Sequence, residues 1–205
     1  MGESARPVIE EALAALGIEV RLGIDLASIS PAGMTLKSGE EIPAATVVWC
    51  AGMRANSLTQ LFPVERDRFG RIPVDEFMRV RGMANVFAAG DVAWARMDDR
   101  HVSVMSCQHG RPMGRFAGHN VVSDLFGLPM LPLHIAWYVT VLDLGSWGAV
   151  YTEGWDRHVV TKGAAAKKTK QLINCQRIYP PLTRNRQEIL AAAAPVVQEP
   201  PKTYH

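Results

Sequence analysis

The segment 85–91 is the part of the sequence that most clearly carries chemistry. It has the composition of a buried β-strand and ends in Gly90-Asp91. Ligands of open α/β sheets bind beyond the carboxyl ends of strands. Glycine lets a ligand approach the backbone closely, and a carboxylate accepts hydrogen bonds from sugar-like hydroxyls. The alternative is an ordinary turn in which Asp91 caps nearby backbone N–H groups.

The segment 106–114 is a second candidate, because it opens a helix that the apolar spacing predicts over residues 113–126. A helix N-terminus offers unpaired N–H groups and a partial positive charge, which stabilise electron density on a bound group. Gln108 and His109 could contact such a group; alternatively, Gln108 is a cap and His109 a surface residue. Cys107 and His109 are two residues apart and do not face each other, which argues against a nucleophile–base pair.

The elements that must position these residues follow from local patterns. Residues 7–16 are predicted to form a helix that ends at Gly17. The continuous apolar run 46–50, which stops at Ala51-Gly52, is typical of a parallel strand buried on both faces. The other elements expected are strands over 18–22, 135–141 and 147–152, a hairpin of 27–30 with 33–36, and helices over 162–170 and 183–194.

Composition bounds the class of protein. The chain has 205 residues, 48% of them apolar and 20% charged, with a formal net charge of +2, so we expect a globular protein that does not bind nucleic acid. Cys50, Cys107 and Cys175 lie far apart, which favours a reducing compartment, and the histidines show no metal-ligand spacing. No apolar run approaches the roughly 20 residues of a membrane span. We therefore expect a cytoplasmic protein, or one that rests on the cytoplasmic face of a membrane.

Four segments together resemble a known group of enzymes. These segments are 46–52, 75–79, 85–91 and 108–120, and they are similar to the C-terminal half of flavoproteins with two dinucleotide-binding domains. Within that superfamily, the segments 142–145, 148–150 and 178–181 resemble type II NADH dehydrogenases, the NADH:quinone oxidoreductases. The resemblance extends from about residue 3 to residue 181.

The resemblance implies an α/β fold, namely part of a Rossmann-like FAD- and NAD(P)-binding flavoprotein with a β-rich C-terminal region. Residues 1–45 would be a remnant of the NAD(P)H-binding domain, and 46–130 the C-terminal part of the FAD-binding domain. Residues 131–205 would form a β-hairpin followed by helix.

The resemblance also implies a function: NADH passes a hydride to FAD, and electrons continue to a quinone-like acceptor. Gly90 and Asp91 would then hold FAD, and Ala51 and Gly52 would lie near both nucleotides. Cys107, Gln108 and His109 would lie near the flavin and the quinone. Pro112 stands where the family pattern has a second glutamine.

Neither of the two Gly-x-Gly-x-x-Gly loops that such an enzyme needs is present in the 205 residues. We therefore expect a C-terminal fragment, or one subunit of a split enzyme completed by a homodimer or by a chain that supplies the N-terminal half. The alternative is a non-catalytic partner or dimerisation module that works through residues 134–161. The lysines at 162, 167, 168 and 170 form either a solvated face or a patch for anionic lipid.

Overall fold

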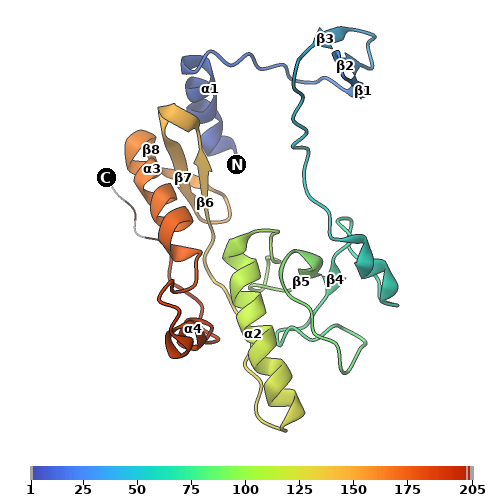
Figure 1. Ribbon diagram of the computed structural model, residues 1–205, viewed down its shortest axis with the longest axis vertical. Coiled ribbons are helices and arrows are strands. Elements are labelled where there is room, and N and C mark those ends of the chain that lie inside the picture. The colour runs from blue at the N-terminus through green and yellow to red at the C-terminus, as the bar shows by residue number, and fades with distance from the viewer. Residues whose placement is uncertain (1, 202, 204–205) are drawn as a thin grey trace. The chain divides into compact units, whose positions relative to one another are not determined.

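The computed structural model describes residues 2–201 and 203, and these form two compact units. The smaller unit is Glu10–Gly52. It holds the three-stranded antiparallel sheet β1 (Leu26–Ser30), β2 (Gly33–Leu36) and β3 (Glu41–Pro43), shown in Figure 1. The predicted hairpin is confirmed. Gly33 is required at the turn, because its φ is +139° and a Cβ there would lie 2.2 Å from the carbonyl oxygen of Ile42.

The first helix, α1 (Arg6–Ala15), confirms the helix expected over 7–16. Gly17 follows it with a φ of +68°, the left-handed conformation that terminates helices.

The predicted strands at 18–22 and 46–50 are wrong. Both segments are extended but unpaired, and Val48 and Trp49 are 77% and 65% exposed. An apolar run becomes a buried strand only where other strands flank it, and no described segment pairs with residues 46–50. The apolar composition of residues 46–50 is typical of a buried strand, but burial needs flanking strands, and the described residues provide none.

The predicted strand at 85–91 is also wrong. Phe87 forms one isolated antiparallel bridge with Arg79, and Gly90–Val92 form the 3-10 turn η3. In the described residues parallel pairing is limited to β4 (Ile72–Pro73) with β5 (Ala93–Trp94). The 3-10 segment η2 (Ser57–Leu61) precedes these two strands.

The long helix α2 (Cys107–Leu125) organises the core of the larger unit. It begins six residues before the predicted start, and one face of it is buried. Met113, Phe116 and Ala117 pack into a cluster with residues from β4, β5 and the segment that follows α2. The apolar residues of that cluster are Ile72, Val74, Met78, Val80, Ala93, Ala95, Met97, Met113, Phe116, Ala117, Leu133 and Ile135.

The C-terminal region holds an antiparallel sheet of β6 (Val139–Asp143), β7 (Ala149–Glu153) and β8 (His158–Lys162), with η4 (Gly145–Trp147) between the first two strands. The helix α3 (Gly163–Leu172) packs on this sheet. The chain continues through a π-helical turn, η5 (Ile173–Arg177), to α4 (Arg186–Ala192).

These elements confirm the β-rich tail and both predicted C-terminal helices. The first strand starts at Val139 rather than at residue 135. The reason is that Leu133 and Ile135 are buried in the α2 core instead. There the N–H of Leu133 donates to the carbonyl of Glu76, and the N–H of Ile135 donates to the carbonyl of Met97.

His109 belongs to the core rather than to the surface. Its side chain is fully buried, and its Nδ1 accepts a 2.8 Å hydrogen bond from the N–H of Val104. The ring lies 5.9 Å from the rings of both Tyr138 and Trp155, and those two rings are stacked 4.5 Å apart. Burial lowers the pKa of His109 from 6.5 to about 4, because the apolar surroundings disfavour the charged imidazolium.

This shift predicts acid lability. Unfolded His109 binds a proton below pH 6.5 but folded His109 only below about 4, so its contribution is complete above pH 6.5 and is lost as the pH falls towards 4. The free energy of unfolding should fall by about 3 kcal/mol over that range. Urea unfolding at a series of pH values measures it. The His109→Gln variant should lose this dependence, and His134→Gln, at an exposed histidine, should keep it. A profile that His109→Gln leaves unchanged would contradict the assignment.

Candidate functional site

The turn at Gly90-Asp91 and the first turn of α2 lie against each other. A Cβ placed on Gly110 would be 3.5 Å from the Cα of Gly90, an ordinary van der Waals distance, so the two backbones lie close together. The structure therefore brings together the two segments that the sequence singled out for their chemistry.

Asp91 is an exposed carboxylate without a partner. Within the part of the chain that the structure describes, its oxygens accept no hydrogen bond and form no ion pair. The alternative interpretation, in which Asp91 caps nearby backbone N–H groups, is therefore wrong. Gly90 has a φ of +74° and open space where a side chain would stand, so the turn is accessible to a ligand.

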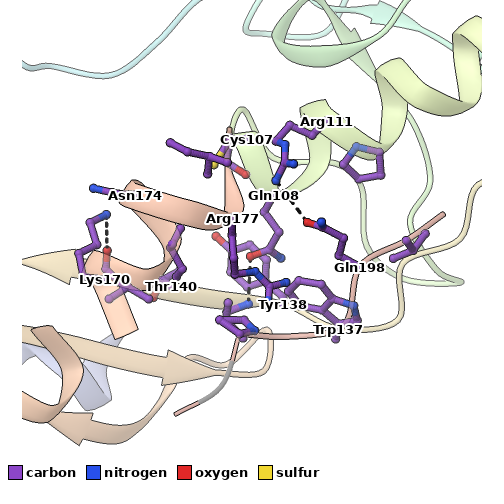
Figure 2. Close-up of a pocket in the computed structure, with 18 of the residues that line it drawn as sticks. Cys107, Gln108, Arg111, Trp137, Tyr138, Thr140, Lys170, Asn174, Arg177 and Gln198 are labelled. Atoms are coloured by element: carbon purple, nitrogen blue, oxygen red, sulfur yellow. Dashed lines mark hydrogen bonds between the residues drawn. The ribbon is translucent and has the colours of Figure 1, made fainter. Parts of the chain in front are cut away.

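Gln108 lies on the other side of the same helical turn and lines a cavity of about 280 Å³ (Figure 2). Its Oε1 accepts a 3.4 Å hydrogen bond from the N–H of Val139. Its Nε2 is buried with no partner, as is the Oγ of Ser106. Cys107 also lines this cavity. His109 does not, because its ring points into the aromatic core.

Pro112 lies inside α2, where it cannot donate the usual backbone hydrogen bond to the carbonyl of Gln108. It lines the cavity with an apolar ring. The position that holds a second glutamine in the family pattern therefore offers no hydrogen bond here.

The remaining cavity wall combines apolar and cationic side chains. Trp137, Val141, Ile173, Ile178 and Val197 provide the apolar surface. The cationic side chains are Arg111, Arg115, Lys170 and Arg177. Our sequence reasoning missed these arginines. The i, i+4 spacing of Arg111 and Arg115 was a usable signal, whereas nothing in the local sequence pointed to Arg177.

The electrostatic environment of the arginines is unfavourable. Burial, together with the charge of Arg111, lowers the pKa of Arg115 below its ordinary value. The same two causes lower the pKa of Arg177. Lys170 is better placed, because its Nζ donates a 3.0 Å hydrogen bond to the carbonyl of Val141.

Ala51 and Gly52 belong to the other unit, at the end of its extended segment. Both are exposed, and Gly52 has a φ of +90°. The structure therefore does not join them to the Gly90, Asp91 and Gln108 group.

Two further properties bear on the site. No helix of the described residues has the length and apolar character needed to cross a bilayer. Across that same part of the chain, no three histidine, cysteine, aspartate or glutamate side chains gather in a way that could hold a metal ion.

Comparison with known proteins identifies the family. Residues 1–114 match the family described as pyridine nucleotide-disulphide oxidoreductase. An NADH dehydrogenase-like protein of Mycobacterium tuberculosis is 66% identical over 201 residues, which cover 98% of this chain and 50% of that protein. A type II NADH:quinone oxidoreductase of Haemophilus influenzae is 30% identical over 129 residues, covering 62% of this chain and 29% of that protein. A demethylphylloquinone reductase of Synechocystis is 25% identical over 178 residues, covering 85% and 43%.

The chain spans about half the length of the curated relatives that match most of its residues. The relatives confirm the resemblance to NADH dehydrogenases that the sequence indicated. With more than half of its residues matched, the chain belongs to the pyridine nucleotide-disulphide oxidoreductase family.

Proposed function

We propose that the protein acts as an FAD-dependent NAD(P)H dehydrogenase that delivers electrons to a quinone-like acceptor. The observation that carries the proposal is the contact between the Gly90-Asp91 turn and the first turn of α2. This contact puts an unpaired carboxylate on one side of the helix start and a cavity with an unpaired amide on the other.

The residues of this region fit FAD. Asp91 has free acceptor oxygens for ribityl or ribose hydroxyls, and the open space at Gly90 admits a group close to the backbone. On the cavity side, the buried Oγ of Ser106 and Nε2 of Gln108 lack partners, which a bound acceptor would supply. When bound, FAD supplies hydride acceptance and onward electron transfer.

Gln108 is the best candidate for contact with the acceptor. Its Nε2 can donate a hydrogen bond to a quinone carbonyl, while its Oε1 stays fixed on the N–H of Val139. The N-terminus of α2 adds a partial positive charge where the acceptor gains electrons. Pro112 and Trp137 form apolar wall that packs on a ring and excludes water.

His109 serves this site indirectly in our proposal. By accepting from the N–H of Val104 it fixes the loop that leads into Ser106 and Gln108, so we assign it a positioning role. Cys107, which lines the cavity, would lie near the flavin. Ala51 and Gly52 would lie near the nicotinamide nucleotide in the proposed enzyme. A quinone-like acceptor would bring the protein to a membrane surface.

The Asp91→Ala substitution tests the flavin contact. Losing hydrogen bonds from FAD hydroxyls to a charged acceptor should weaken FAD binding about 10- to 150-fold, from roughly 1.5–3 kcal/mol. Equilibrium dialysis of FAD against the protein measures the change. Asp99→Ala removes an exposed carboxylate eight residues away and should bind FAD as the unmodified protein does. If the Asp91→Ala and Asp99→Ala variants bind FAD equally well, Asp91 is a turn residue only.

The Gln108→Ala substitution tests the acceptor contact. Removing one hydrogen bond of about 1–2 kcal/mol should slow quinone reduction roughly five- to thirty-fold, with a smaller effect on flavin reduction by NADH. Stopped-flow absorbance separates the two half-reactions. Gln171→Ala, on the exposed side of α3, is the matched control. Equal slowing of both half-reactions would assign Gln108 to the flavin alone, and no slowing of either would remove it from the site.

A further inference from the structure

Three arginines converge on the cavity without a counter-ion. Arg111 and Arg115 come from successive turns of α2, and Arg177 from the end of η5; all three are half-buried. No aspartate or glutamate lines the cavity, and none of these arginines forms an ion pair within the described residues. A half-buried group of like charges is unfavourable unless an anion neutralises it.

The three side chains bind neutral oxygens of the C-terminal segment instead. Arg111 donates to the Oε1 of Gln198 at 3.3 Å, a bond drawn in Figure 2, and Arg115 donates to the carbonyl of Val196 at 3.4 Å. Arg177 donates to the carbonyls of Glu199 and Pro200. A guanidinium group gains Coulombic attraction and paired N–H···O bonds from an anionic oxygen group, which a single neutral carbonyl or amide oxygen does not supply. An anion that enters the cavity would therefore compete well for these donors.

The rest of the wall restricts what such an anion can be. Trp137, Ile173 and Ile178 present flat or branched apolar surface beside the arginines. The volume of about 280 Å³ lies just below the usual range of small-molecule sites, so it admits one or two fused rings but not a large chain. A bare inorganic anion would leave the apolar surface uncovered.

We propose that this cavity binds an acidic ring compound, with its ring on the apolar wall and its anionic oxygens on Arg111, Arg115 and Arg177. The cavity is also the acceptor site of the proposed function, and to that extent the inference rests on it. The acceptor would then be a quinone that carries an ionised oxygen group rather than a neutral quinone. The planar guanidinium groups suit carboxylate-like geometry, in which two N–H groups reach two oxygens.

Calorimetric titration of the full chain tests this, with no flavin and no NADH present. The probes are 2-naphthoate and 2-naphthamide, which share ring and shape and differ in charge. We expect naphthoate to bind at least about tenfold more tightly. The Arg115→Gln substitution should weaken the binding of naphthoate about tenfold and the binding of naphthamide less than about twofold. Arg177→Gln is the second variant, in case the first alters folding. Arg186→Gln, on α4 and outside the cavity, is the charge-matched control and should change neither affinity.

Equal affinity for the two probes, or a naphthoate affinity that neither Arg115→Gln nor Arg177→Gln changes, would overturn the acidic selectivity. Either result would leave a neutral acceptor, and hence the proposed function, in place. Inorganic phosphate that binds as tightly as naphthoate would overturn the requirement for a ring. Failure of both probes to bind would overturn the inference itself. The proposed function has a separate test in the Asp91→Ala and Gln108→Ala substitutions.

Discussion

The buried face of α2 is the constraint on which the rest of the larger unit depends. Asn120 in that face is fully buried, and its amide makes three hydrogen bonds, to the carbonyls of Phe77 and Leu131 and from the N–H of Leu131. Moving the helix by a residue would break these bonds and leave buried polar groups unpaired, which is costly. Met113 and Phe116 add apolar burial in the same register. The position of the first turn of α2 follows from this anchoring.

A fixed first turn allows one short segment to present two different surfaces. Gly110 meets Gly90 and brings the helix start to the exposed carboxylate of Asp91. Gln108 faces the cavity, and Arg111 and Arg115 line it further along the helix. In the proposed enzyme, Asp91 would hold the flavin nucleotide and Gln108 would contact the acceptor, so one helical turn would help to position both groups. The chain's own residues would contribute orientation and charge, and the redox chemistry would come from the bound flavin.

Local patterns were sufficient for α1, for the β1–β2 hairpin and for the C-terminal helices, because glycine positions and apolar spacing act over a few residues. They failed for residues 46–50 and 85–91, because a buried strand is defined by its neighbours in a sheet and not by its own composition. Gly90, Asp91 and Gln108 could be selected from the sequence. The place of Arg177 in the cavity wall could not, since it reaches the cavity only through tertiary packing of the C-terminal segment against α2.

Native-state hydrogen exchange tests most directly whether the Gly90-Asp91 turn and the start of α2 form one unit. Amides in peptides spanning residues 86–94 and 104–112 of the full chain would be followed by mass spectrometry at increasing urea concentrations. We expect both peptides to open with the same free energy and the same urea dependence, since they share the α2 core. A turn at 90–92 that exchanges freely while α2 stays protected would contradict the claim that the helix holds the site together.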